Sequence, residues 1–496
     1  MNEQDASGRS SLRGDLGFYF LANILPLGAS VGGMAWVLRL VPAAEFGVFN
    51  LLAASASILA TAGGHWICQW IIRNGSQFVA PETRVASWTV LWRGAAASFG
   101  LILGAALALA LVRPLWAVAD GATILLCVTL ATQAIFITVL QGTGRAREYA
   151  STFALSTLLR WISTVVFCYF WKGKSSLWWA LLCGQLVGQV AATFLAARAL
   201  RGCICFRFFA GNLRELELQA LSYGTPFLVW AVSMQLLNVA DRYVIQGFAG
   251  LQQVGVYSAI YNLSNAGVMV LTNPVLLAFA PRIFQRAGAA SSLHSNVDAR
   301  QLTESSLQLL LIIGSPLLVW SALLHREFVT LVLGAKYAQT TRVFPLVVGG
   351  ILVWQFAQIM QKGFETAGQT RALGSSIGSA VVVNLLLNFI LVPRLGIIGA
   401  ALATVGGYVW YAGLIAVRVS RYGRPRIALR SLMNVLGATA FSSSLLFLST
   451  RFERGLWMRG ASCLLCLGLY AGALLLLKET ILTTRGRIVP RILGTR

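Results

Sequence analysis

Residues 154–170 read ALSTLLRWISTVVFCYF, an apolar run that is interrupted by one charge, Arg160. A helix of about 20 apolar residues crosses a lipid bilayer, and this run together with its neighbours reaches that length. A guanidinium group near the middle of the bilayer costs roughly 2.5 kcal/mol or more unless it faces a protein interior or a watery cavity. The run therefore predicts a transmembrane helix whose arginine faces the protein interior or a watery cavity and has a role there.

The rest of the chain has the same character. Its 496 residues are 57% hydrophobic and only 11% charged, whereas a soluble protein carries charge at about 25% of its positions. The net charge of +23 would suggest a nucleic-acid partner in a soluble domain. Here, however, Lys and Arg lie mainly in short connections between apolar segments, where they orient the chain in the membrane. We therefore expect a polytopic membrane protein that binds no nucleic acid.

Polar residues divide the sequence into apolar segments, each long enough to cross a bilayer. We therefore expect an all-α fold with about fourteen transmembrane helices. They are expected at residues 18–41, 46–72, 87–112, 116–140, 149–171, 176–198, 220–247, 253–280, 303–325, 343–364, 372–392, 396–418, 427–449 and 456–477.

Lysine and arginine set the expected orientation. They are more frequent in the connections on the side of the two chain ends, for example at Arg198, Arg201 and Arg207, than in the opposite connections. Cytoplasmic loops carry such an excess. We therefore expect both termini to lie in the cytoplasm.

Metal and cofactor chemistry is not expected. The chain has three histidines, and its Cys463-x-x-Cys466 pair lies in an apolar segment without a nearby His, Asp or Glu. A metal site needs several such ligands close together. We therefore expect neither a metal site nor a cofactor.

The first and second halves of the chain resemble each other. The segment Arg39–Phe49, with Gly47, parallels the segment Gly247–Tyr257, with Gly255, and each joins the first two helices of its half. Because six helices are an even number, the two halves share one orientation in the membrane. The expected domains are a cytoplasmic tail at 1–17, an N-lobe at 18–199, a linker at 200–219, a C-lobe at 220–419, two added helices within 420–480 and a basic cytoplasmic tail at 481–496.

The linker at 200–219 mixes aromatic and charged side chains. Phe206, Phe208 and Phe209 are interspersed with Arg and Glu positions. Such a mixture is typical of an amphipathic helix that lies in the membrane interface. We therefore expect an interfacial helix on the inner face between the two lobes.

Several motifs resemble those of a known family. The runs Tyr223–Pro226, Leu237–Ile245, Val254–Tyr261 and Pro281–Phe284 are similar to the seventh and eighth helices of bacterial oligosaccharide (polysaccharide-unit, O-antigen type) flippases. These flippases belong to the multidrug/oligosaccharidyl-lipid/polysaccharide exporter superfamily. The resemblance covers about residues 15–420. Further matches are Ala44–Gly47, Gln69–Arg73, Gly334–Tyr337 and Pro393–Leu402.

The resemblance implies a MATE-like bundle of two six-helix lobes in the bacterial cytoplasmic (inner) membrane. Such a protein moves an undecaprenyl-pyrophosphate-linked oligosaccharide from the inner to the outer leaflet by alternating access, for exopolysaccharide, capsule or O-antigen biosynthesis. The implied partners are this lipid-linked oligosaccharide, membrane lipids, and polysaccharide polymerase and export proteins. The two added helices are similar to those of the peptidoglycan-precursor flippase, but the arginine set of that family on helices 1, 2 and 8 is missing here.

A cavity for such a substrate needs positive charge for the phosphates and hydrogen-bonding groups for the sugars. Arginine suits the phosphates because its planar fork can bind two oxygens and keeps its charge. Arg160 lies near mid-depth, and the repeat aligns it with Asn384 in the second half. Both are candidate cavity residues, as is Arg93 near the inner end of its helix. Alternatively, Arg160 locks the bundle through carbonyl groups or an acid, and Arg93 extends to the interface.

Two further pairs could line the cavity or couple transport to an ion. Asp241 and Arg242 lie near the outer end of their helix, where a buried carboxylate could exchange a proton. Adjacent opposite charges also form structural ion pairs, which is the alternative. His65 and Gln69 lie one helical turn apart and could place a titratable group in the cavity. A hydrogen-bonded histidine in the core is the alternative for that pair.

The segment 343–364 and the residue that follows it carry a polar stripe. Gln355, Gln358, Lys362 and Glu365 are spaced three to four residues apart, so they share one helix face. A stripe of this kind is unfavourable against lipid, and we expect it to face the protein interior. Gln358 and Lys362 are candidate substrate contacts, and Glu365 is a further coupling candidate. Contact with other helices is the alternative.

Two other roles stay open. An ion-coupled multidrug or small-molecule exporter of the same superfamily would need an acidic residue at mid-depth, and no expected helix has one there. A non-transporting subunit of an export complex is the other alternative. An enzyme is not expected, because the longest outer connection runs only from about His325 to Arg342 and leaves little room for a catalytic domain.

Overall fold

The computed structural model describes residues 26, 28–112, 117–173, 176–287, 297–362, 365, 370–419, 427–452 and 456–477. These residues form helices, turns and loops, and no strand occurs among them. Eleven of the described helices are long and apolar enough to cross a membrane, and one of these covers two expected spans. The all-α membrane fold is therefore confirmed. Both expected terminal tails lie outside the described residues.

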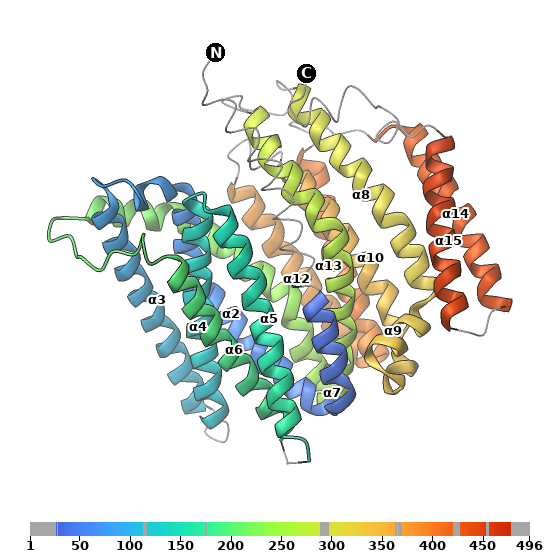
Figure 1. Cartoon of the computed structure of the whole chain (residues 1–496), viewed down its shortest axis with the longest axis horizontal. Helices are drawn as coiled ribbons and strands as arrows, with labels where there is room; N and C mark the ends of the chain where they lie inside the picture. The colour runs from blue at the N-terminus through green and yellow to red at the C-terminus, as the bar shows by residue number, and fades with distance from the viewer. Residues whose placement is uncertain are drawn as a thin grey trace. The chain divides into compact units, whose positions relative to one another are not determined.

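The helices follow one another along the chain (Figure 1). A helix at residues 28–40 comes first. The others are α2 (Ala43–Arg73), η1 (Gly75–Phe78), α3 (Arg84–Val112), α4 (Ala117–Gly142), α5 (Ala146–Phe170), α6 (Leu177–Ala199), α7 (Arg214–Ala287), α8 (Val297–Leu323), α9 (His325–Leu333), η3 (Ala335–Thr340), α10 (Val343–Met360), α12 (Thr370–Leu395), α13 (Ile397–Val419), α14 (Leu429–Phe452) and α15 (Leu456–Leu476).

Helix α7 contains two of the expected helices in one run. It is helical from Arg214 to Ala287 except at Gly250, where φ is 82° and ψ is 171°. Glycine has no Cβ and adopts a positive φ without steric cost, so the chain can change direction at this residue. The break lies between the two expected spans, but no separate loop joins them.

The expected interfacial helix at 200–219 is wrong for most of its length. Helix α6 ends at Ala199, and residues 201–213 form turns and a loop before α7 begins. The side chain of Arg84 accounts for part of this, because it donates hydrogen bonds to the carbonyl oxygens of Gly202, Cys203 and Ile204. These carbonyl groups are thus satisfied outside a helix.

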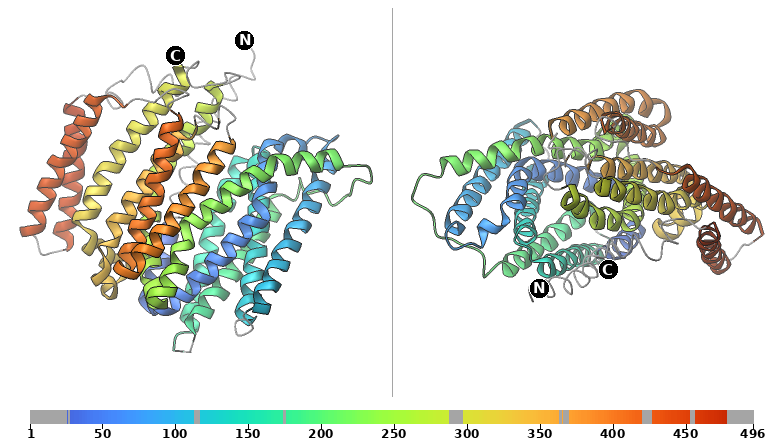
Figure 2. Two further views of the ribbon diagram at one scale, coloured as in Figure 1. Left: turned by 180° about the vertical axis from the view of Figure 1, so that it is seen from behind. Right: turned by 90° about the horizontal axis from the view of Figure 1, so that it is seen from above.

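The chain forms two compact units. The first contains residues 1–266, 330–340 and 370–407, and the second contains residues 267–329, 341–369 and 408–496. In the first unit α5 packs along α6, and α4 packs against both α2 and α6 (Figure 1). In the second unit α14 packs against α15 and α8, and α8 also packs against α10 (Figure 2). The lobe boundaries that the internal repeat predicts stay a prediction.

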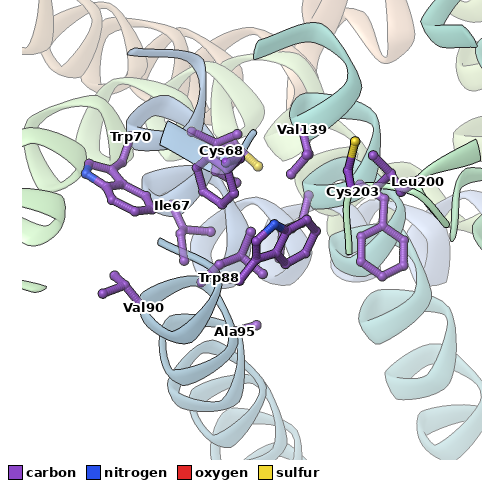
Figure 3. Packing of buried hydrophobic residues seen from close by; sticks show 14 of the residues in the cluster. Ile67, Cys68, Trp70, Trp88, Val90, Ala95, Val139, Leu200 and Cys203 are labelled. Carbon is purple, nitrogen blue, oxygen red and sulfur yellow. The ribbon is translucent and has the colours of Figure 1, made fainter. Parts of the chain in front are cut away.

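An aromatic core joins α2, α3 and α4 at one end of the first unit. The Trp70 and Phe78 rings meet edge to face with centroids 5.5 Å apart, and Phe78 meets Trp88 in the same way at 5.6 Å. Leu200 and Cys203 are buried in the same cluster (Figure 3). The core therefore fixes the start of the loop that follows α6.

Candidate functional site

Arg160 lies in the middle of α5, where this helix packs closely on α6. Gly188 of α6 faces the backbone of Arg160, and a Cβ atom at Gly188 would lie only 2.5 Å from the Arg160 Cα atom. The hydroxyl group of Ser163 also donates a hydrogen bond to the carbonyl oxygen of Gly184 at 2.6 Å. Because Gly188 has no side chain, α5 and α6 can approach each other closely at this point. The contact holds the backbone of Arg160 in place.

The guanidinium group of Arg160 has few partners. Its Nη2 atom donates one long hydrogen bond, of 3.3 Å, to Thr157 Oγ1 one turn earlier on α5. Its Nε atom is buried and has no partner. None of the ion pairs between described residues includes Arg160. The arginine is therefore not neutralised by an acid in this part of the chain, and its hydrogen-bonding capacity is largely unused.

Asn384, the expected counterpart of Arg160, is fully buried in α12. Asn388, one turn later, donates hydrogen bonds to the Asn384 carbonyl oxygen at 2.9 Å and to its Oδ1 atom at 3.2 Å. The Nδ2 atom of Asn384 and the Oδ1 atom of Asn388 are buried without a partner. Gly407 of α13 faces the Asn384 side chain. Asn384 thus belongs to a buried amide pair next to α13, and no described hydrogen bond joins it to Arg160.

Asp241 is buried where three helical segments meet. One carboxylate oxygen, Oδ2, accepts hydrogen bonds from the Tyr257 hydroxyl group at 2.5 Å and from Thr404 Oγ1 at 3.3 Å. The other oxygen, Oδ1, is buried without a partner. Tyr257 lies beyond the Gly250 break of α7, and Thr404 lies on α13. A carboxylate that is 1% exposed and only half satisfied is costly when charged.

Arg242 has partners of its own. It is 5% exposed, and its Nε atom donates to Ser258 Oγ at 3.1 Å while Nη2 donates to Asn262 Oδ1 at 3.4 Å. Its guanidinium group also lies over the Tyr261 ring, 5.2 Å from the centroid. An ion pair between the side chains of Asp241 and Arg242 is not among those of the described residues. The side chains of the two neighbours therefore have different hydrogen-bonding partners.

His65 and Gln69 meet on one face of α2, as their spacing predicts. The Nε2 atoms of the two side chains are 3.1 Å apart, and both residues are half-buried. One turn earlier on α2, Thr61 accepts a hydrogen bond of 3.2 Å from Gln235 of α7. This face of α2 is thus a polar strip that reaches α7.

Arg93 forms an ion pair at the edge of the first unit. Its Nη1 atom lies 2.9 Å from Glu217 Oε1 at the start of α7, and the Arg93 side chain is 53% exposed. The positive charge is therefore already matched by an acid. Arg93 is a weaker candidate for an anionic ligand than Arg160.

The polar stripe of α10 faces the interior of the second unit. Gln355 and Gln358 are buried, and Gln355 donates a hydrogen bond of 2.7 Å to Thr272 of α7. Beyond the end of α10, Lys362 and Glu365 form an ion pair of 2.7 Å. Gln361, which also bonds Glu365, accepts a hydrogen bond from Tyr411 of α13. The stripe therefore serves, at least in part, to join helices.

Sequence reasoning missed the partners of the buried groups. Tyr257 and Thr404 bond Asp241, and Asn388 bonds Asn384. The spacing of Asn384 and Asn388 by one helical turn was a usable signal. Tyr257 and Thr404 come from distant segments, and a single sequence without aligned relatives does not reveal such pairs.

Comparison with known proteins gives the family context. The family model described as "Polysaccharide biosynthesis protein" matches residues 12–286, which is more than half of the chain. An uncharacterized membrane protein of Methanocaldococcus jannaschii is 24% identical over 201 residues. That match covers 39% of this chain and 38% of the archaeal protein, so it spans well under half of that relative.

Solved structures share the fold. The lipid II flippase MurJ in an inward closed conformation gives a TM-score of 0.70 at 13% identity, over 94% of this chain and 98% of that one. An inward-facing multidrug resistance MATE family transporter of the MOP superfamily gives a TM-score of 0.58 at 16% identity, over 82% of this chain and 98% of that one. At these identities the likeness establishes the fold alone.

Proposed function

The chain belongs to the polysaccharide biosynthesis protein family, as its motifs predicted, and has a MATE-like fold; from this premise we propose that it flips a lipid-linked oligosaccharide across the membrane. The substrate is an oligosaccharide unit on undecaprenyl pyrophosphate. It moves from the inner to the outer leaflet of the bacterial cytoplasmic membrane by alternating access, and it supplies the synthesis of an exopolysaccharide, a capsule or an O-antigen. Both chain termini lie in the cytoplasm.

Arg160 carries the proposal. Its guanidinium group lies at the middle of a transmembrane helix, has a buried Nε atom without a partner and has no acidic partner among the described residues. A charge held in that state is unfavourable unless water or a ligand of opposite charge reaches it. A pyrophosphate offers oxygens that match the planar fork of arginine and hydrogen bonds strengthened by charge. The pyrophosphate group of the substrate is therefore the anion that Arg160 binds in this proposal.

Neutral polar groups are assigned to the sugars. His65 and Gln69 form a half-buried pair on α2 that can donate and accept hydrogen bonds. The buried amides of Asn384 and Asn388 keep one donor and one acceptor unused. In the second unit, Gln358 and Lys362 stay candidates, but Lys362 is neutralised by Glu365. Because Lys362 is paired with an acid, Arg160 is a stronger candidate than Lys362 for binding phosphate.

Asp241 is the proposed coupling group. Its Oδ1 atom is buried and unsatisfied, whereas its Oδ2 atom accepts hydrogen bonds from two hydroxyl groups. A carboxyl group in such a place changes its charge readily when the surrounding helices move, which is what coupling to a proton requires. Glu365 and Arg242 are less suitable, because an ion pair and several hydrogen bonds, respectively, already hold them.

A transport measurement with the purified full-length chain tests this function. The protein is reconstituted into proteoliposomes with a polyprenyl-pyrophosphate-linked disaccharide, and an impermeant sugar-oxidising enzyme reports the fraction of the lipid in the outer leaflet. We expect faster exchange of this lipid than in protein-free liposomes. A chain that does not accelerate exchange, yet folds and inserts, would be a non-transporting subunit of an export complex.

A second candidate function rests on the MATE-like fold, which the multidrug resistance transporter shares. In this alternative the protein exports a small molecule in exchange for an ion. The same proteoliposomes distinguish the two functions. Uptake of a cationic dye such as ethidium, driven by a proton or sodium gradient and without exchange of the lipid-linked disaccharide, would favour the exporter.

A further inference from the structure

The loop between α6 and α7 exposes three phenylalanine side chains. Phe206, Phe208 and Phe209 are 73%, 65% and 43% exposed. Exposed apolar rings are unfavourable in water, and three of them within four residues indicate a contact with a membrane or a protein. Most of the surface of these three rings is therefore left uncovered by the part of the chain that the structure describes.

Hydrogen bonds hold the loop firmly on α3. Arg84 donates to three successive carbonyl oxygens, those of Gly202 at 3.1 Å, Cys203 at 3.2 Å and Ile204 at 3.3 Å. The indole group of Trp92 donates to the Cys205 carbonyl oxygen at 3.0 Å. The chain's own hydrogen bonds thus hold the loop along the first turns of α3.

The exposed rings lie beside a tryptophan of α3. Phe206 stacks on Trp92 with centroids 5.6 Å apart and an interplanar angle of 13°. The backbone N–H group of Phe209 donates to Thr89 Oγ1 at 3.0 Å. Tryptophan is enriched at the depth where lipid headgroups meet acyl chains. The loop therefore holds the Phe206 ring against Trp92, a residue type that favours the headgroup region of a membrane.

The surface of α6 gives the depth of the loop. Val187, Val190 and Phe194 are exposed at 48%, 47% and 61%, and their spacing places them on one face of a helix that is apolar enough to span the membrane. Arg198, one turn after Phe194, is exposed on the same face. An apolar face that ends in arginine marks the passage from acyl chains to headgroups. The loop begins directly after this level.

The charge of the loop matches an anionic surface. Arg201, Arg207 and Arg214 are exposed, and the sequence has no Asp or Glu between Arg198 and Arg214. Basic residues next to a membrane span attract anionic lipid. Aromatic rings and arginines that alternate in one rigid loop fit a layer that offers acyl chains and phosphate groups together.

We propose that residues 200–214 form a binding surface for anionic phospholipid. Phe206, Phe208 and Phe209 enter the upper acyl-chain region of the leaflet, and the neighbouring arginines contact lipid phosphate groups. The apolar face of α6 continues into this surface, which favours lipid over a partner protein as its occupant. The surface holds the connection between α6 and α7 at the membrane and is independent of the transported substrate.

Lipid binding to the purified full-length chain tests the role of the arginines. Native mass spectrometry measures the selectivity for phosphatidylglycerol over phosphatidylcholine in the wild type and in an Arg201→Gln/Arg207→Gln variant. Because each arginine near an anionic surface favours binding about fivefold, we expect the selectivity to fall about 25-fold. The matched control, Lys172→Gln/Arg394→Gln, removes two exposed charges elsewhere in the chain. Unchanged selectivity in the loop variant, or an equal loss in the control, would overturn the proposal.

Hydrogen exchange tests the role of the rings. Amide exchange in residues 204–213 is compared between nanodiscs of phosphatidylcholine alone and nanodiscs with added phosphatidylglycerol. We expect several-fold slower exchange with the anionic lipid, and loss of this protection in Phe206→Ser/Phe208→Ser, whose side chains are 73% and 65% exposed. Equal exchange in both nanodiscs would contradict lipid binding and would leave a partner protein as the occupant.

Discussion

Gly47 of α2 and Gly255 of α7 contact each other in a reciprocal way. A Cβ atom on either glycine would lie 3.0 Å from the backbone nitrogen of the other. Each glycine also faces the carbonyl oxygen four residues before its partner, Leu251 for Gly47 and Ala43 for Gly255. The sequence comparison of the two halves pairs the same two glycines. The two glycines that the internal resemblance aligns are therefore also in contact with each other.

The close approach predicts opposite effects for two glycine substitutions. In Gly255→Ala the new methyl group overlaps the carbonyl group of Ala43, so we expect destabilisation by about 1–3 kcal/mol. In Gly378→Ala the methyl group meets no atom within 4 Å, and the loss of a helical glycine is expected to stabilise by about 0.5–1 kcal/mol. Tryptophan fluorescence during thermal unfolding in detergent measures both. Equal unfolding midpoints for the two variants would show that α2 and α7 can move apart at Gly255 without loss of stability.

One oxygen of the Asp241 carboxyl group has no hydrogen-bonding partner. We therefore expect Asp241→Asn to uncouple lipid exchange from the proton gradient without unfolding the protein. The amide can still accept the hydrogen bond from Tyr257, and its NH₂ group replaces the oxygen that lacks a partner. We expect a thermal midpoint close to that of the wild type and lipid exchange that no longer responds to a pH gradient. Glu82→Gln, which neutralises an exposed acid, is the control. A variant that still responds to the gradient would exclude Asp241 as the coupling group.

The ion pair of Lys362 and Glu365 predicts non-additive stability effects. The side chains are 14% and 21% exposed, so either charge is poorly solvated without its partner. We expect Lys362→Met alone to cost about 1–3 kcal/mol, and Lys362→Met/Glu365→Gln to cost less than the sum of the two single changes. A double-mutant cycle from thermal unfolding measures this difference. Additive effects would mean that the two side chains act independently and would restore Glu365 as a coupling candidate.

His325, the first residue of α9, is expected to make the stability of the protein depend on pH. Burial lowers the pKa of this histidine below its ordinary value of 6.5, and Nδ1 lies 2.7 Å from Thr341 Oγ1. Above pH 6.5 the imidazole is neutral in both the folded and the unfolded chain. As the pH falls through 6.5, the unfolded chain binds the proton first, so stability is lost toward the lower pKa of the folded chain.

His325→Gln removes the titrating group and keeps a polar side chain next to Thr341. We expect the variant to lose less stability than the wild type between about pH 7 and pH 5. Unfolding midpoints at a series of pH values give the comparison. Parallel curves for the two proteins would assign the pH dependence to other groups.

The sequence predicted the helices well because the membrane imposes one rule on all of them. A span needs about 20 apolar residues, so runs such as 154–170 are visible without any tertiary information. The loop at 201–213 was missed because its conformation depends on Arg84, which lies far away in the chain and satisfies its carbonyl groups. Amphipathic composition alone does not distinguish a helix from a loop whose backbone carbonyl groups bond to a distant side chain.

The candidate site was predicted one residue at a time and not as a set of contacts. Buried charges are rare in a membrane, so Arg160 and Asp241 were conspicuous in the sequence. Their partners were not, because Tyr257 and Thr404 reach Asp241 only through the packing of α7 and α13. The reverse holds for Arg93, whose position suggested a cavity although Glu217 neutralises it at the edge of the first unit.

The central claim, that Arg160 binds the pyrophosphate of the lipid-linked substrate, is tested most directly by the rate of lipid exchange in proteoliposomes. Arg160→Gln keeps a polar side chain of similar reach but removes the charge, and Arg160→Lys keeps the charge but removes the planar fork. Arg394→Gln removes an exposed arginine near the end of α12 and is the control. We expect Arg160→Gln to slow exchange of the polyprenyl-pyrophosphate-linked disaccharide by at least about tenfold, and Arg160→Lys to retain part of the activity. Exchange by Arg160→Gln at the rate of the wild type and the control would contradict the account.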